Sequence, residues 1–198
     1  MSNRPLLIII GGPNGAGKTT LSTYLIERKR LSRDVTPIIN PDEIALTLSI
    51  PGQKERGFHA ARLALIQRES FLNSRQSFAI ETTFSGNSEV NLLSQAKAVG
   101  YEIVGYYIIL NNIQDSVFRV QDRVKKGGHN VPIKNLFIRY QRSLQNLTEN
   151  FQQFDRLYLF DNSKSYRSRI AVLEKGELNW INKKHLAHPL VKRLGLEV

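Results

Sequence analysis

The feature that most constrains the fold is a glycine-rich segment near the start of the chain. Residues 12–19 read GPNGAGKT and match the pattern G-x-x-x-x-G-K-[ST] at every fixed position. The segment follows the apolar run Leu6–Ile10 and precedes an amphipathic stretch from Leu21, so it lies between a predicted strand and a predicted helix. Glycines in such a loop let backbone N–H groups surround phosphate oxygens, because no Cβ blocks their approach. The sequence therefore predicts a loop that binds the phosphates of ATP or GTP.

Each position of this loop has an expected role. Lys18 is expected to contact the β- and γ-phosphates, the Thr19 hydroxyl to bind Mg²⁺, and the N-terminus of the next helix to add partial positive charge. The alternative is a glycine-rich turn without a ligand, which the coincidence of motif and context disfavours. The residues expected to bind the nucleotide in this segment are Gly12, Pro13, Asn14, Gly15, Ala16, Gly17, Lys18, Thr19 and Thr20.

Short apolar runs alternate with helical patterns along the rest of the chain. Continuous apolarity is typical of strands buried on both faces of a parallel sheet. The further runs are Val35–Ile39, Phe78–Ile80, Ile103–Leu110 and Leu157–Phe160. Helical spacing relates Phe58, Ala61, Leu65 and Leu72, then Val117, Val120 and Val124, and then the series from Ile133 to Leu147. The alternation predicts an α/β fold, a three-layer P-loop sandwich with a mainly parallel sheet.

The 198 residues contain no repeat, linker or abrupt change in composition, which predicts a single domain over residues 1–198. The segment Ile170–Leu178 has Lys175-Gly176 in its middle and is typical of a small hairpin. From Asn182 onward the pattern is weak and basic. We therefore expect a small basic C-terminal extension over about residues 165–198.

The charge balance favours anionic partners. The chain has 28 Lys and Arg against 17 Asp and Glu, a formal net charge of +11, although self-repulsion that maintains solubility explains such an excess equally well. The run Leu6–Ile10 is too short to span a bilayer and is followed by glycines instead of a signal-peptide cleavage site. The absence of cysteine excludes disulfides and thiolate chemistry. We expect a cytoplasmic protein without a membrane partner.

Two carboxylates are candidates for acid–base chemistry. Asp42 follows the second predicted strand, and ligands of doubly wound sheets bind beyond the carboxyl ends of the strands. A carboxylate there can accept the proton of a hydroxyl that attacks the γ-phosphate. The alternative is that Asp42 or Asn40 only caps the helix that begins near Glu43. Glu81 leaves a neighbouring strand in the same way and is the second candidate, with a surface carboxylate at a strand end as its alternative.

An arginine-bearing segment over about residues 115–132 is a candidate lid. Arg119 and Arg123 share a helix face, and Gly127-Gly128 would supply a hinge before the helix that carries Arg139. Arginine suits phosphoryl transfer because its planar fork matches phosphate oxygens. The alternative for each arginine is a solvated basic helix face. We interpret His129 as part of the lid, and the whole pattern favours a small-molecule kinase over a motor or switch ATPase.

Four strings in this order resemble the zeta-toxin family. They are GGPNGAGKTT at 11–20, NPDEIA at 40–45, ETT at 81–83 and GGHNVP at 127–132, and the likeness continues to Asp161-Asn162-Ser163, so that it covers about residues 5–163. The resemblance implies a P-loop kinase that uses ATP and Mg²⁺. The best-known members phosphorylate the 3′-hydroxyl of UDP-N-acetylglucosamine, so a hydroxyl-bearing small molecule such as a nucleotide sugar is the implied acceptor. An antitoxin protein is the implied partner.

The resemblance also implies roles for individual residues. It makes Asp42 the general base and Lys18 the lysine of the loop. It makes Arg123 and Arg139 catalytic arginines of the lid. The implied binding residues are Glu81 and Thr83, with Asp42, on the acceptor side, and Asn162 near the adenine. From its place in the lid segment, Arg119 is also expected to bind the nucleotide.

Two departures from the family weigh against UDP-N-acetylglucosamine itself. After Glu81 and Thr83 the peptidoglycan-targeting members tend to carry a basic residue, whereas this chain has Phe84-Ser85, and it is shorter than the long streptococcal-type toxins. A polynucleotide 5′-hydroxyl kinase stays open as an alternative, although the basic residues are not interleaved with aromatic ones as a base-stacking surface requires. A nucleotide-regulated binding protein with weak ATPase activity is the third hypothesis, and it would not need Asp42.

Overall fold

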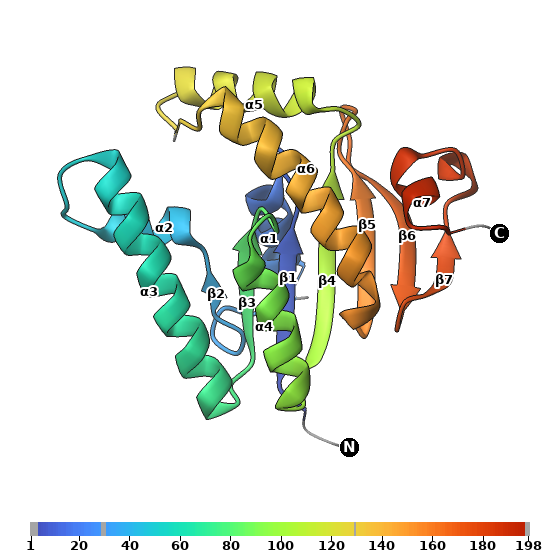
Figure 1. The fold of residues 1–198 in the computed structure, drawn as a ribbon, viewed down its shortest axis with the longest axis horizontal. Helices are drawn as coiled ribbons and strands as arrows, with labels where there is room; N and C mark the ends of the chain where they lie inside the picture. Colours follow the sequence, from blue (N-terminus) through green and yellow to red (C-terminus); the bar gives the residue numbers. More distant parts are fainter. Residues whose placement is uncertain (1–3, 29–30, 129, 197–198) are drawn as a thin grey trace.

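The computed structural model describes residues 4–28, 31–128 and 130–196. Within these residues the centre of the molecule is a seven-stranded sheet in the order β2-β3-β1-β4-β5-β6-β7 (Figure 1). The pairs from β2 to β5 are parallel, and β6 and β7 continue the sheet with antiparallel pairing. The strands are β1 (Leu6–Gly11), β2 (Ile38–Ile39), β3 (Phe78–Thr82), β4 (Glu102–Ile109), β5 (Arg156–Asp161), β6 (Ser168–Glu174) and β7 (Glu177–Ile181).

Helices cover both faces of the sheet and one of its ends (Figure 1). They are α1 (Lys18–Glu27), α2 (Pro41–Thr47), α3 (Gln53–Ser74), α4 (Asn87–Ala98), α5 (Ile113–Lys125), α6 (Ile133–Asn150) and α7 (Pro189–Arg193), with short 3-10 turns at Phe151–Gln153 and Lys183–His185. Helix α1 packs on one face, α4, α6 and α7 pack on the other, and α5 lies across the edge where the parallel strands end. The predicted three-layer α/β sandwich is confirmed.

The position of β1 between two helical layers explains why its apolar run is continuous. Leu7 and Ile9 belong to the core beneath α4 and α6, whereas Ile8 and Ile10 belong to the separate core beneath α1. Successive side chains of a strand point to opposite faces, so a strand between two helical layers needs apolar residues at every position. The sequence interpretation of Leu6–Ile10 as a doubly buried strand is confirmed.

The predicted strand Val35–Ile39 is wrong over its first three residues. Only Ile38–Ile39 pairs with β3, and Val35 is 70% exposed. The backbone N–H of Thr36 donates to the carbonyl of Ser32 at 2.7 Å, which closes a turn in place of extended chain. Because β2 is the edge strand, no second neighbour extends its pairing.

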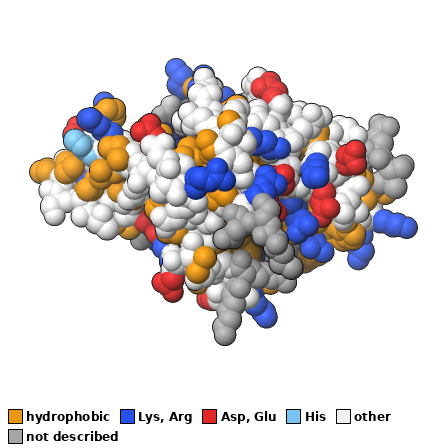
Figure 2. All heavy atoms as spheres, turned by 90° about the horizontal axis from the view of Figure 1, so that it is seen from below, with side chains coloured by type: hydrophobic (Ala, Val, Ile, Leu, Met, Phe, Trp, Pro, Cys, Tyr) orange, Lys and Arg blue, Asp and Glu red, His pale blue; other side chains and the backbone are white. Residues whose placement is uncertain are grey.

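Helix α3 is present, but the face predicted for its core is largely exposed. Phe58 is 71% exposed and Leu65 is also exposed, whereas the buried positions are Ala60, Ala64 and Arg68. The N-terminal half of α3 extends with α2 beyond the edge strand, where no sheet covers it (Figure 1). Figure 2 shows hydrophobic side chains at the surface on this side of the molecule.

The C-terminal segment completes the sheet and the core. The predicted hairpin is confirmed as β6 and β7, and β6 pairs with β5. Leu190 and Val191 of α7 are buried in the same core as α4 and α6. The weak pattern after Asn182 therefore contains a short helix that packs against the sheet. None of the described helices combines the length and the apolar character needed to cross a membrane.

Candidate active site

The phosphate-binding loop connects β1 to α1 through backbone that only glycine adopts without strain. Gly12 has φ +142°, and a Cβ there would lie 2.1 Å from the carbonyl oxygen of Ile108 on β4. Gly17, the residue before α1, has φ +94° in the left-handed region. A side chain at Gly12 requires the loop to move away from β4, and a side chain at Gly17 is strained by the positive φ. The loop can therefore lie this close to the sheet only because glycine occupies these positions.

Lys18 begins α1 and turns its ammonium group back into the loop. Its Nζ donates to the carbonyl oxygens of Gly12 at 3.0 Å and Pro13 at 3.2 Å. Burial lowers the pKa of Lys18 to about 8, because taking the charge out of water disfavours the protonated form. This geometry holds a cation where phosphate oxygens are expected.

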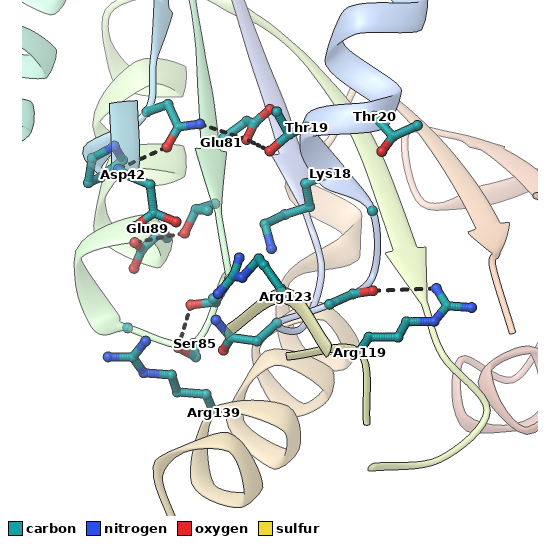
Figure 3. Close-up of a pocket in the computed structure, with 18 of the residues that line it drawn as sticks. Lys18, Thr19, Thr20, Asp42, Glu81, Ser85, Glu89, Arg119, Arg123 and Arg139 are labelled. Carbon is teal, nitrogen blue, oxygen red and sulfur yellow. Dashed lines mark hydrogen bonds between the residues drawn. The ribbon is translucent and has the colours of Figure 1, made fainter. Parts of the chain in front are cut away.

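Four charged side chains of the predicted site lie close enough to Lys18 to affect its pKa. Glu81 and Asp42 oppose the effect of burial by raising the pKa, and Arg123 and Arg139 lower it further. These side chains come from β3, α2, α5 and α6, and they line the same cavity as Lys18 (Figure 3). The structure therefore brings together the five charged residues predicted to act in catalysis or acceptor binding.

Glu81 is buried at the end of β3 and accepts hydrogen bonds from three side chains. One carboxylate oxygen accepts from the Thr19 hydroxyl at 3.0 Å and from the Asn40 amide at 2.9 Å, and the other accepts from the Ser22 hydroxyl at 2.5 Å. Glu81 is only 4% exposed. These contacts place the Glu81 carboxylate beside the Thr19 hydroxyl. The acceptor-side role that the resemblance implies for Glu81 stays a prediction.

Mg²⁺ fits this oxygen donor set. The Thr19 hydroxyl donates its hydrogen bond to Glu81, which leaves the lone pairs of the hydroxyl oxygen for a cation. Carboxylate and hydroxyl oxygens are ligands that Mg²⁺ prefers. No group of three or more His, Asp and Glu residues that could hold a metal occurs in the described part of the chain. A metal here would therefore take its remaining ligands from water and nucleotide, as is usual for Mg²⁺ with phosphates.

Asn40, and not Asp42, caps helix α2. The Asn40 side-chain oxygen accepts from the backbone N–H of Asp42 at 3.0 Å, as expected of an N-cap. The carboxylate of Asp42 makes no hydrogen bond to any described residue and lines the cavity with Lys18. The capping alternative for Asp42 is wrong, and its carboxylate is available to a ligand.

Helix α5 is fastened to the phosphate-binding loop. The Ser116 hydroxyl donates to the carbonyl of Asn14 at 2.6 Å, and Arg119 donates to the carbonyl of Asn162 at 2.6 Å. The Asn162 amide in turn donates to the carbonyl of Ala16 at 2.8 Å. Arg119 and Asn162 thus support the loop from outside. Of these two residues, Arg119 also lines the cavity, whereas Asn162 is not among its lining residues. The adenine contact of Asn162 stays a prediction.

The glycine pair after α5 ends the helix. Gly127 has φ +86° and donates to the carbonyl of Val124, and Gly128 donates to the carbonyl of Arg123 at 2.9 Å, the hydrogen-bond pattern of a Schellman motif. A Cβ on Gly128 would lie 2.5 Å from Cγ of Arg123. The pair therefore leaves room for Arg123 beside the turn. Its role as a hinge stays a prediction, and His129 lies outside the described residues.

The charged residues surround a cavity of about 550 Å³. Thr83 lines it, with its hydroxyl 2.8 Å from that of Ser85, and its binding of an acceptor stays a prediction. The sequence reasoning missed one wall of this cavity, which α3 and the start of α4 supply. A signal for Arg68 was present, since it follows the buried Ala60 and Ala64 at four-residue intervals on one helix face. The missed residues of this wall are Arg68, Ser85, Gly86, Ser88 and Glu89.

Comparison with known proteins agrees with the fold. No protein-family model matches the chain. An uncharacterized protein of Haemophilus influenzae is 29% identical over 118 residues, which are 60% of this chain and 80% of that protein. A chain in the crystal structure of AvrRxo1-ORF1:AvrRxo1-ORF2 with ATP superposes with a TM-score of 0.70 at 16% identity, over 96% of this chain. The structure of the PezAT chromosomal toxin–antitoxin system of Streptococcus pneumoniae gives 0.58 at 18% identity, over 98% of this chain and 88% of that one.

The chain has the fold of a zeta-toxin-like P-loop kinase. It spans 64% of the AvrRxo1 chain that it matches. A chain of the Pnkp1/Rnl/Hen1 RNA repair complex has the same fold at a TM-score of 0.54 and 20% identity, over 75% of this chain and 47% of that one. At these identities the likeness establishes the fold, and the chemistry has to be argued from the residues of the site.

Proposed function

We propose that the protein is an ATP-dependent kinase that transfers the γ-phosphoryl group to a hydroxyl of a small molecule. The observation that carries the proposal is the free carboxylate of Asp42 in the same cavity as Lys18, Arg123 and Arg139. A protein that only binds nucleotide has no need of a base beside the γ-phosphate position. The ATP complex of the structurally similar AvrRxo1 assembly supports ATP as the donor.

Positive charge in the cavity supplies the electrostatic part of the reaction. Lys18 would exchange the carbonyls of Gly12 and Pro13 for β- and γ-phosphate oxygens, which also raise its pKa. Arg123 and Arg139 neutralise charge on the transferring group, the role that arginine fulfils in phosphoryl transfer. Mg²⁺, held by Thr19 and Glu81 together with the phosphates, would supply further neutralisation of the β- and γ-oxygens.

Asp42 supplies the proton acceptor. As the acceptor hydroxyl forms its bond to the γ-phosphorus, the bond from that phosphorus to the β–γ bridging oxygen breaks, and the hydroxyl proton passes to Asp42. ADP and the phosphorylated acceptor are the products. The N-cap at Asn40 fixes the first turn of α2 and hence the position of Asp42.

The acceptor is proposed by resemblance to be a nucleotide sugar. The two-component structures of AvrRxo1 and PezAT support an antitoxin-like protein as a binding partner. A polynucleotide 5′-hydroxyl kinase is the second candidate, favoured by the likeness to a chain of an RNA repair complex and by the net charge of +11. Both acceptors require the same base and the same arginines.

The variant Asp42→Asn tests the proposal. It keeps size and hydrogen-bonding ability but removes the proton acceptor, so we expect unchanged Mg·ATP binding, an unchanged melting temperature, and a loss of about 10² or more in transfer rate. Transfer is measured with γ-labelled ATP on a panel of UDP-N-acetyl sugars and 5′-hydroxyl oligonucleotides. Glu43→Gln is the matched control, since Glu43 is adjacent and pairs with Arg33 at the surface. Full transfer by Asp42→Asn would refute Asp42 as the base and make Glu81 the next candidate.

A further inference from the structure

The cavity has a second wall that faces the phosphate-binding loop and that the reaction described above does not use. Arg68 comes from α3, and Ser85, Ser88 and Glu89 come from the turn after β3 and the first turn of α4. The nucleotide side of the same cavity is formed by the loop and by α5. A phosphoryl acceptor has to lie between these two sides, so the residues of this second wall are expected to contact the acceptor.

Arg68 is a buried cation with unused hydrogen-bonding capacity. It is 6% exposed, and its Nε has no hydrogen-bond partner among the described residues. Its nearest opposite charge is Glu89, whose carboxylate lies 3.9 Å from Nη2, beyond hydrogen-bond distance. Burial lowers the pKa of Arg68. A buried guanidinium in this state is costly unless further oxygens pair with it.

Glu89 is held where it is and does not close the gap to Arg68. One of its oxygens accepts from the Thr82 hydroxyl at 3.0 Å, and the other accepts from the Ser88 hydroxyl at 3.0 Å. A Cβ on Gly86 would lie 2.6 Å from the second oxygen, so glycine at this position leaves room for the carboxylate. The structure thus holds the counter-charge at 3.9 Å from Arg68, which lines the cavity with an Nε that has no partner among the described residues.

We propose that Arg68 binds an oxyanion of the acceptor, a carboxylate or a phosphate group, at the wall opposite the phosphate-binding loop. Arginine forms paired hydrogen bonds to either group, and such bonds are stronger when one partner is ionised. The inference rests on the proposed kinase function and narrows its substrate to anionic hydroxyl compounds. The fixed carboxylate of Glu89 limits the space to one oxyanion and favours a hydroxyl or amide N–H of the same acceptor beside it.

Anion binding to the nucleotide-loaded protein tests this assignment. The protein is first saturated with Mg²⁺ and the non-hydrolysable analogue AMP-PNP, so that phosphate cannot occupy the loop. Inorganic phosphate and acetate are then titrated separately by calorimetry. We expect at least one of them to bind wild-type protein and the Arg62→Met control, whose arginine is exposed on the same helix. The preferred anion distinguishes a phosphate-bearing from a carboxylate-bearing acceptor.

Arg68→Met is expected to weaken that binding at least tenfold, and Arg68→Lys to retain part of it. The double variant Arg68→Met, Glu89→Gln removes both buried charges, so a loss of anion binding in the folded double variant is not due to an unpaired carboxylate. Equal anion affinity of wild type and Arg68→Met, or no binding by wild type, would overturn the proposal. Anion binding is measured without phosphoryl transfer, so its result does not depend on whether the kinase proposal is correct. Transfer to a neutral acceptor that is unaffected by Arg68→Met would refute the role of Arg68 and leave the kinase proposal standing.

Discussion

Replacement of Asn40 by alanine is expected to disturb two carboxylates of the candidate site at once. The side-chain oxygen of Asn40 caps α2 at the backbone of Asp42, and its amide donates to Glu81 at 2.9 Å. Loss of an N-cap costs about 1 kcal/mol, and loss of a buried hydrogen bond to a charged group costs about 2 kcal/mol. The free energy of unfolding is therefore expected to fall by about 3 kcal/mol.

This loss is large enough to measure by thermal unfolding. In a protein of this size, about 1 kcal/mol corresponds to a change of roughly 2–4 °C in melting temperature, so Asn40→Ala is expected to melt roughly 6–12 °C below wild type. Transfer activity at a temperature where the variant is folded is expected to fall as well, because Asp42 loses its support. A melting temperature within about 2 °C of wild type would refute the reasoning.

Asn40→Asp separates the two contacts. Aspartate is also a good N-cap, but here it places a second carboxylate against Glu81. One of the two carboxyls then has a raised pKa in the folded protein, so the variant is most stable when that group is protonated and loses stability as the pH rises through its folded pKa. Melting curves between acidic and neutral pH are expected to show this loss, with no such dependence in Asn40→Ala.

Two further substitutions and one pH dependence test other parts of the site. Arg123→Ala is expected to lower kcat by on the order of 10³ with little change in ATP affinity, and an unchanged kcat would mean that Arg123 does not act on the transferring phosphoryl group. ATP binding is expected to take up a proton near pH 8 and to weaken at higher pH, because phosphates raise the pKa of Lys18 from its lowered value of about 8. Calorimetry in two buffers of different ionisation enthalpy measures this uptake, and its absence would contradict the assignment. Gly12→Ala places a Cβ 2.1 Å from the carbonyl of Ile108 and is expected to abolish ATP binding, which a wild-type dissociation constant would disprove.

The phosphate-binding loop and the strands other than the edge strand β2 were predictable because their signals are local. The motif lies between an apolar run and a helix. The continuous apolar run Leu6–Ile10 indicates on its own that helices cover both faces of the sheet at this strand. The exposure of the apolar side chains on α3 was not predictable from such local signals. Helical spacing gives the periodicity of Phe58 and Leu65, but whether a sheet lies beneath them depends on which strand forms the edge.

The composition of the site was predictable only in part, for the same reason. Glu81 was identified from its place at a strand end, yet its contact with Thr19 follows from the pairing of β3 with β1, where Glu81 is opposite Ile10. The wall around Arg68 and Glu89 is formed by residues 21 positions apart in sequence, which meet only after β3 is placed between β2 and β1. Nothing in the local pattern near either residue indicates the other.

The fastening of α5 to the phosphate-binding loop limits how this helix can move without disturbing the loop. The bonds from Ser116 and Arg119 fix the first half of the helix, whereas Arg123 lies one turn further on, near the end that Gly127 terminates. A swing of the whole helix would break these bonds and deform the loop that has to bind the next nucleotide. For the proposed kinase we therefore expect ADP release to involve bending or unwinding of the last turns of α5, which would withdraw Arg123 while the loop keeps its shape.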